Sequence, residues 1–475
     1  MAERKTWVKG CLAVVAVLAL AVGGAAVLFG GQLLGIAGVG AGYKSKIMCS
    51  SVFVSGRTQE NVENVDLLAT QSYPITATVD REKNEVVASM VGIYSKRAVY
   101  RDGLGCTVVV GIDDEELQAQ AKAAPAPHEP PPADMGWPHG SGGIKELPAY
   151  VDEGKLADAL DFAFTDPEPD SPVGTRAVAI VHKGTLVAEM YAPGFGRDTP
   201  LLGWSMTKSV NAALVGIIVK QGKLDIMDPA PVPEWQGPGD PRGAITTDQL
   251  MRMSSGLKFI EEYEENITSD CNVMLFNSYD MAHFAASMPL AHDPDTVWSY
   301  SSGTTNILAR IVRHKVGGTD EDYFAFPREE LFGKLGMASA VLEPDPSGTF
   351  VGSSHMYATA RDWARFGLLC LRDGVWDGER ILPEGWIEYC TTPTPTAPEG
   401  KYGAQFWLNR GSPDDPGDRW LPGLPTDLYS ARGHEGQYVT VVPSEDLVVV
   451  RLGFTPNHKA VWDHGRFIEM VLEAL

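Results

Sequence analysis

The chain has 475 residues, of which 44% are hydrophobic and 21% are charged, and its formal net charge is -22. This composition is typical of a globular protein with a sizeable core, and the length allows one large domain with an extension or two to three smaller domains. The strong acidity argues against nucleic acid as a partner, because proteins that bind nucleic acid need a basic face.

The N-terminal segment has the pattern of a membrane anchor. Arg4, Lys5 and Lys9 precede an uncharged run over residues 10–31, which as a helix would be about 33 Å long, enough to cross a membrane. The basic residues before the run predict that the rest of the chain lies outside the cytoplasm, on the periplasmic side of a bacterial inner membrane. A signal peptide cleaved near residues 23–26 is the alternative. Residues 1–42 therefore form the predicted anchor region.

Two short regions precede the globular part of the chain. Residues 43–112 predict a small strand-rich extension, because segments such as 51–54 and 106–111 carry β-branched residues. Residues 113–145 are rich in Pro, Ala and Gly. Their composition predicts an exposed linker without regular structure.

The six cysteines do not form a metal-binding pattern. Cys49 and Cys106 flank the extension, and the sequence leaves open whether they form a disulfide in an oxidising compartment or stay as unpaired thiols. No Cys or His spacing matches a zinc site. The sequence therefore predicts neither a metal nor a cofactor.

Residues 146–475 have the pattern of a single large domain. Apolar side chains at helical spacing predict helices over residues 151–164 and 461–475. Two pairs of β-rich segments, at residues 176–191 and 438–452, predict hairpins. Strands at both ends of a helix-rich middle predict an α+β fold, in which helices flank an antiparallel sheet and a large helical insertion interrupts it.

The tetrapeptide Ser-x-x-Lys occurs twice, from Ser205 to Lys208 and from Ser255 to Lys258. Only the first is followed by apolar residues at helical spacing, so only the first places serine and lysine on one face of a helix. A serine hydroxyl is a weak nucleophile until a base takes its proton. A lysine at a helix N-terminus can be that base, because the helix dipole and burial disfavour its ammonium form. The alternative is a solvated lysine one turn after a serine that begins a helix.

Two further motifs follow the first in order. Tyr-Ser-Ser at residues 300–302 precedes a helical pattern at 304–314, and His-Glu-Gly at 434–436 opens the last hairpin. In this order, the three motifs resemble those of the β-lactamase-like serine hydrolases. The resemblance is greatest to the branch of class C β-lactamases, D-alanyl-D-alanine carboxypeptidases, esterases and 6-aminohexanoate-dimer hydrolases. It covers about residues 150–475, with further matching stretches at 250–257, 356–367 and 402–407.

The resemblance implies a role for each motif. Ser205 is the nucleophile and becomes acylated, while Lys208 and Tyr300 share the work of general base. The backbone N–H groups of Ser205 and Gln437 form the expected oxyanion hole. Gly436 lets the strand approach the substrate closely. A buried aromatic residue with a satisfied hydroxyl is the alternative for Tyr300.

Two departures from the family pattern affect the predicted substrate. Ser302 replaces the usual asparagine of the second motif, so one amide contact to the substrate is missing. His434 stands where β-lactamases usually carry lysine, and is either a substrate-binding group or a structural histidine. This partly charged histidine sits beside an anionic Glu435. If Glu435 faces the site, it should repel the carboxylate of a penicillin or a D-alanine peptide. Trp204 either lines the pocket or packs at the start of the helix.

The segment 259–280 contains several acidic residues and is expected to shape the pocket. An acidic rim would favour a substrate with a cationic end, and a solvated surface loop is the alternative. The residues concerned are Glu261, Glu262, Glu264, Glu265 and Asp270, with Tyr263 between them.

Together these features predict a serine hydrolase that acts on small amides or esters through an acyl-enzyme. The alternatives are a cell-wall D-amino-acid carboxypeptidase or transpeptidase, a weak β-lactamase, and a non-catalytic binding module on the same fold. The predicted partners are a small-molecule substrate and, through the N-terminal helix, the membrane.

Overall fold

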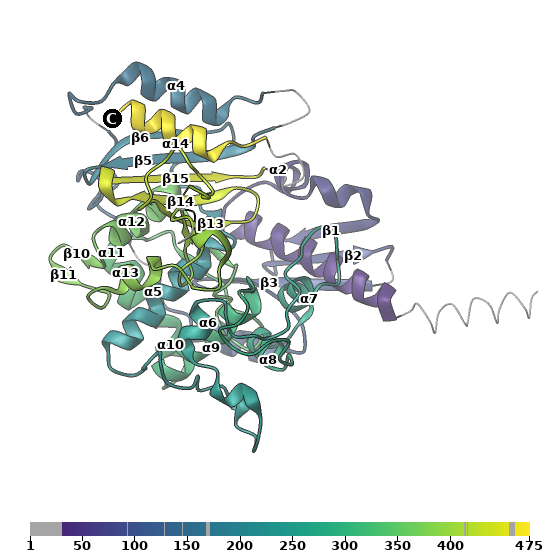
Figure 1. Ribbon diagram of the computed structural model, residues 1–475. Coiled ribbons are helices and arrows are strands. Elements are labelled where there is room, and N and C mark those ends of the chain that lie inside the picture. Colours follow the sequence, from purple (N-terminus) through teal and green to yellow (C-terminus); the bar gives the residue numbers. More distant parts are fainter. Residues whose placement is uncertain are drawn as a thin grey trace, which may run out of the picture.

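A six-stranded antiparallel sheet organises the C-terminal part of the chain in this computed structural model (Figure 1). The structure describes residues 31–475, except 93, 128, 145, 168–171, 413, 414, 416 and 456–460. The sheet confirms both predicted hairpins, and β15 pairs with β5 to bring the two ends of the domain together. In spatial order its strands are β12 (Trp407–Leu408), β13 (Tyr429–Gly433), β14 (Gln437–Val442), β15 (Leu447–Gly453), β5 (Thr175–His182) and β6 (Thr185–Tyr191).

Helices cover both faces of this sheet, as the α+β prediction requires. The terminal helices α4 (Glu153–Phe164) and α14 (His464–Glu473) lie together on one face, where their apolar side chains form one core with the sheet (Figure 1). On the other face α12 (Ala360–Leu371) packs closely, since a Cβ at Gly367 would lie 2.5 Å from Val448.

The predicted helical insertion lies between β6 and β12. Its central helices are α5 (Met206–Lys220) and α9 (Ser302–Val316), which are buried over most of their length. Around them lie α6 (Thr247–Met251), α7 (Asp270–Asn277), α8 (Met281–Ala286), α10 (Asp320–Pro327), α11 (Gly333–Leu335) and α13 (Trp386–Thr391). Short strands complete the insertion: β7 (Leu201–Leu202), β8 (Val341–Leu342), β9 (Met356–Ala358), β10 (Val375–Trp376) and β11 (Glu379–Arg380).

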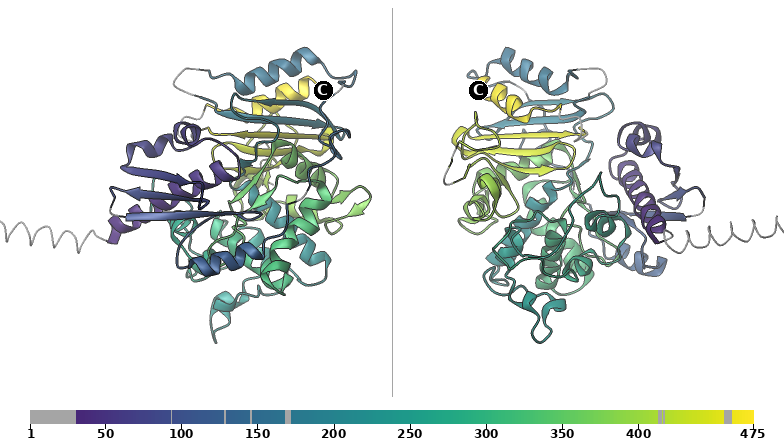
Figure 2. Two further views of the ribbon diagram at one scale, coloured as in Figure 1. Left: turned by 180° about the vertical axis from the view of Figure 1, so that it is seen from behind. Right: turned by 45° about the vertical axis from the view of Figure 1, so that its right-hand side comes forward.

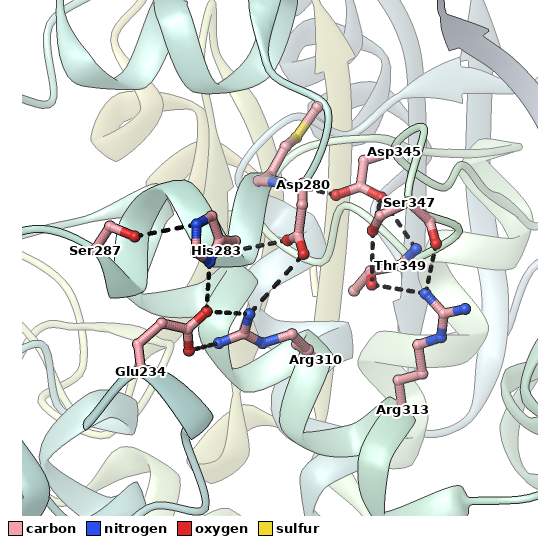
Figure 3. A network of polar contacts seen from close by, with 10 residues as sticks. Glu234, Asp280, His283, Ser287, Arg310, Arg313, Asp345, Ser347 and Thr349 are labelled. Carbon is pink, nitrogen blue, oxygen red and sulfur yellow. Dashed lines mark hydrogen bonds and ion pairs between the residues drawn. The ribbon is translucent and has the colours of Figure 1, made fainter. Parts of the chain in front are cut away.

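A polar network fixes α9, the helix that follows the Tyr-Ser-Ser motif (Figure 3). Arg310 donates to both carboxylate oxygens of Glu234, at 2.8 and 2.6 Å, and Nδ1 of His283 lies 2.6 Å from the same carboxylate. One turn further along, Arg313 donates to the carbonyl oxygen of Ser347 at 2.7 Å. These charge-assisted bonds tie α9 to α8 and to the neighbouring loops.

The N-terminal extension packs beside the insertion (Figure 2). It consists of a helix over residues 31–53, α2 (Gln59–Val65) and an antiparallel meander of four strands. The prediction that residues 51–54 form a strand is wrong, because Val39, Met48 and Val52 give this segment a buried helical face. The strands are β1 (Ile75–Asp80), β2 (Glu85–Met90), β3 (Tyr94–Arg101) and β4 (Gly105–Val108).

A disulfide links two parts of the extension, and an ion pair links the extension to the helical insertion. Cys49 and Cys106 form a disulfide with Cα atoms 6.1 Å apart, which settles the alternative left open by the sequence. Lys46 forms a buried ion pair with Glu343. The same carboxylate accepts hydrogen bonds from the hydroxyl of Ser50 at 2.8 Å and from the backbone N–H of Cys106 at 2.6 Å. The extension and the insertion therefore share one buried interface.

Residues 113–145 differ from the exposed linker that their composition predicts. They begin with α3 (Asp114–Lys122), which has a capping box at its N-terminus. The later part is irregular, but Trp137 is buried, and Arg361 and Arg365 from α12 donate to its backbone carbonyls. The arginines supply the hydrogen bonds that a Pro- and Gly-rich backbone cannot make with itself, so the segment stays docked.

The predicted membrane span at residues 10–31 lies outside the described residues, except for Gly31. Within the part of the chain that the structure describes, no helix combines the length and the apolar character needed to cross a membrane.

Candidate active site

Ser205 lies at the N-terminus of α5 and is partly exposed. The preceding Trp204 has a φ of 47°, in the left-handed region, so the chain turns sharply just before the serine. The end of β13 lies against this turn, because a Cβ at Gly433 would be only 2.1 Å from the carbonyl oxygen of Gly203. Only glycine permits this approach, which brings the third motif next to the first.

Lys208 is buried one helical turn after Ser205, and three oxygen atoms surround its amine. Nζ lies 3.0 Å from Oγ of Ser205, 2.9 Å from Oγ of Ser302 and 3.1 Å from the carbonyl oxygen of Ser353. The first two motifs therefore converge on one amine, and Ser353 is a partner that the sequence did not indicate.

Tyr300 lies on the other side of the same amine. Its ring centroid is 4.8 Å from Nζ of Lys208, and the ring packs against Trp407. Burial raises the pKa of Tyr300, while the positive charge of Lys208 and hydrogen bonding with Ser205 act in the opposite direction. Tyr300 therefore lies beside the Ser205–Lys208 pair, and burial holds its hydroxyl proton more tightly than water would.

Ser302 is fully buried and has protein partners on both sides. Its Oγ accepts from Lys208, donates to Oε1 of Glu261 at 2.5 Å, and its backbone N–H donates to Oε2 of Glu261 at 2.7 Å. These bonds hold Ser302 firmly in place, and its role as a substrate-binding residue stays a prediction. Glu261 is the residue that sequence reasoning missed, since it stood out only as one member of an acidic stretch.

His434 packs among aromatic rings above the turn. It stacks on Tyr263 at a centroid distance of 4.8 Å and meets Trp204 edge-on at 5.6 Å. Burial lowers the pKa of His434 to about 4, so the imidazole is neutral at pH 7. Burial among the aromatic rings thus opposes the expected partial charge on this histidine, although carboxylate oxygens of Glu435 and Glu264 lie 3.7 and 4.0 Å from its Nε2.

Glu435 is buried between the extension and the rest of the third motif, and its Oε1 lies 3.7 Å from Nε2 of His434. It has a φ of 61° and lines a cavity of about 20 Å³ together with Tyr43 and Arg176. Burial raises the pKa of Glu435 to about 8, although Arg176 and a hydrogen bond with Trp204 oppose the rise. The glutamate is thus mostly uncharged at pH 7 and contributes little of the expected repulsion of a substrate carboxylate.

Gln437 and Gly436 hold the shape of the last hairpin. The side chain of Gln437 donates to the carbonyl oxygen of Gly453 at 2.7 Å and accepts from its N–H at 2.9 Å. Gly436 has a φ of 82°, and a Cβ there would lie 2.3 Å from Nη1 of Arg451. This glycine is therefore required by internal packing and not only by approach to a substrate.

The rest of the predicted acidic rim is at the surface. Glu262, Glu264 and Glu265 are exposed, whereas Glu261 is partly buried and turned toward Ser302. Of the two alternatives for this segment, the solvated surface loop fits most of the acidic residues. Glu261 is the exception.

Comparison with known proteins identifies the family to which this site belongs. The Beta-lactamase family model matches residues 173–457, more than half of the chain. The chain belongs to the Beta-lactamase family. It is 26% identical over 313 residues to the 6-aminohexanoate-dimer hydrolase of Paenarthrobacter ureafaciens, a match that covers 61% of this chain and 75% of that protein.

Solved structures of other proteins share the fold. A Bacillus anthracis protein provisionally named as a 6-aminohexanoate-dimer hydrolase aligns with a TM-score of 0.55 at 22% identity, over 72% of this chain and 88% of that one. A family VIII carboxylesterase aligns with a TM-score of 0.54 at 17% identity, over 70% of this chain and 99% of that one. The resemblance to β-lactamase-like hydrolases predicted from the motifs is thus confirmed.

Proposed function

We propose that this protein is a serine hydrolase that cleaves small amides or esters through an acyl-enzyme on Ser205. The observation that carries the proposal is the 3.0 Å contact between the partly exposed hydroxyl of Ser205 and the buried amine of Lys208. A nucleophile within hydrogen-bond reach of a base, which is in turn oriented by further groups, is the arrangement that covalent catalysis needs.

In the proposed reaction, Oγ of Ser205 attacks the carbonyl carbon of the substrate while its proton moves to the cluster formed by Lys208 and Tyr300. The backbone N–H groups of Ser205 and Gln437 stabilise the oxyanion. The same cluster then returns the proton to the leaving amine or alcohol, which departs and leaves an ester on Ser205. Water hydrolyses this ester, with the cluster acting again as base, so the products are an acid and an amine or alcohol.

The neutral imidazole of His434 supports amides and esters, rather than β-lactams, as the substrates. A penicillin carries a carboxylate that favours a fixed positive charge, and the imidazole of His434 offers none at pH 7. Among the similar proteins, one is named for an amide, the 6-aminohexanoate dimer, and another as a carboxylesterase, while a third is provisionally named as a β-lactamase, so the names alone do not decide the substrate. Small linear amides and simple esters are therefore the substrates to test first.

A substrate panel tests the proposal. Wild-type protein should hydrolyse p-nitrophenyl butyrate and the 6-aminohexanoate dimer faster than nitrocefin, and Ser205→Ala should abolish all turnover. Ser255→Ala is the matched control, because Ser255 belongs to the other Ser-x-x-Lys sequence and should be dispensable. Residual turnover in Ser205→Ala, or nitrocefin as the best substrate, would contradict the proposal.

We further propose that residues 10–31 anchor the protein to a membrane with the hydrolase domain outside the cytoplasm. The uncharged run after three basic residues supports the anchor. The disulfide between Cys49 and Cys106 supports an oxidising compartment. Carbonate extraction of membranes and protease digestion of intact cells would test this, and a protein released by carbonate would count against the anchor.

A further inference from the structure

Glu261 makes two hydrogen bonds to one residue next to the proposed catalytic lysine. Its Oε2 accepts from the backbone N–H of Ser302 at 2.7 Å, and its Oε1 accepts from the Ser302 hydroxyl at 2.5 Å. A carboxylate only accepts hydrogen bonds. The hydroxyl proton of Ser302 is therefore committed to Glu261, and Oγ of Ser302 can offer only a lone pair to Lys208.

This constraint decides how a neutral Lys208 can be oriented. A neutral amine has two N–H donors and one lone pair. Two of the three oxygens around Nζ are obligate acceptors, namely the carbonyl of Ser353 at 3.1 Å and the hydroxyl of Ser302 at 2.9 Å. They use both N–H groups, so the lone pair is left facing the third oxygen, Oγ of Ser205, at 3.0 Å.

We propose that Glu261 is a positioning residue that directs the lone pair of Lys208 toward Ser205 by fixing the proton of the Ser302 hydroxyl. The inference rests on the proposed function. When Oγ of Ser205 bonds to the substrate carbonyl carbon, the Oγ–H bond breaks and its proton becomes the third proton on Nζ. The resulting ammonium keeps the same two acceptors, so Lys208 need not rotate during the transfer.

The loop that carries Glu261 is held firmly enough for this task. On one side, Ile260 makes two hydrogen bonds: its carbonyl oxygen accepts from the N–H of Cys271 at 3.1 Å, and the N–H of Ile260 donates to the carboxylate of Asp270 at 2.9 Å. On the other side, Asn272 donates to the carbonyl oxygen of Tyr263 at 2.9 Å. The start of α7 therefore clamps the backbone before and after Glu261.

Substitution by glutamine tests the proton geometry with little change of shape. The amide of Glu261→Gln has one accepting oxygen and a donating NH2 group, so it cannot accept both bonds from Ser302. Once the NH2 group donates to Oγ of Ser302, the hydroxyl proton turns toward Lys208 and competes with Ser205 for the lone pair. The expected result is a fall in kcat of about 100-fold, the size of a general-base contribution. KM should change little, since Glu261 does not touch the substrate.

A double-mutant cycle separates this role from a merely structural one. Without the Ser302 hydroxyl, Glu261 has nothing to orient, so Glu261→Gln should have no further effect on kcat in a Ser302→Ala background. Additive losses in the double variant would overturn the inference. Glu262→Gln is the matched control, since Glu262 is exposed, and circular dichroism with thermal melting should show each variant folded.

The same measurements distinguish failure of the inference from failure of the proposed function. If wild-type turnover depends on Ser205 but Glu261→Gln is as active as Glu262→Gln, only the positioning role is wrong. If wild-type protein has no Ser205-dependent turnover, the proposed function is wrong and the inference falls with it.

Discussion

Glu435 gives the sharpest prediction about stability, because its carboxyl is buried beside the extension. Burial raises its pKa to about 8 from an ordinary value of 4.5. Between these two values the folded protein binds more protons at this group than the unfolded chain does. The contribution of Glu435 to the free energy of unfolding is therefore complete at low pH and is lost as the pH rises toward 8.

The size of the effect follows from the two pKa values. They differ by about 3.5 pH units, which corresponds to about 5 kcal/mol at 1.36 kcal/mol per unit. Glu435→Gln cannot ionise and still accepts a hydrogen bond, so it removes the cost of burying a charge. Relative to wild type, the variant should gain about 4 kcal/mol between pH 5 and pH 9.

Urea denaturation at pH 5, 7 and 9, followed by tryptophan fluorescence, measures this difference. Glu445→Gln is a suitable control, because Glu445 is exposed at the other end of the same strand. Its stability should stay parallel to that of wild type at all three pH values. A gain for Glu435→Gln that does not depend on pH would refute the reasoning, since it would show that the carboxyl ionises equally well in both states.

The remaining predictions concern the packing that supports the site. Replacing Cys49 and Cys106 together by serine should lower the free energy of unfolding by about 2–4 kcal/mol, and a reducing agent should then have no further effect on urea denaturation. Glu343→Ala leaves the buried ammonium of Lys46 unpaired and should cost about 3–5 kcal/mol in the same assay; wild-type stability would contradict the role of this ion pair. Gly433→Ala places a Cβ against the turn before the nucleophile and should lower kcat about 100-fold, so wild-type ester turnover would show that the turn tolerates displacement.

The sequence was most informative where the spacing of neighbouring residues and the order of the motifs along the chain predicted the same structure. Ser205 and Lys208 lie one helical turn apart, so the helical pattern after them placed both on one face, and the two later motifs favoured their contact over a solvated lysine. The hairpins were predictable for the same reason, because alternating β-rich arms around a short turn encode their own register. The extension misled at residues 51–54, where two valines and a phenylalanine resembled a strand, but residues 51–53 are the last turn of a longer helix.

The residues that sequence reasoning missed depend on tertiary contact. Glu261 reaches Ser302 across 41 positions of sequence, and the backbone carbonyl of Ser353 has no side-chain signature at all. The direction of the Glu435 side chain depends on a positive φ and on a neighbouring unit whose docking the sequence did not reveal. Such features require coordinates, because nothing in the local pattern of residues distinguishes an inward carboxylate from an exposed one.

Mass spectrometry of the protein after reaction with a fluorophosphonate probe tests the central claim most directly. The account predicts a single adduct on the peptide that contains Ser205, formed much more slowly in Lys208→Met and absent in Ser205→Ala. An adduct on another residue, or ester turnover that continues after Ser205 is fully labelled, would contradict it.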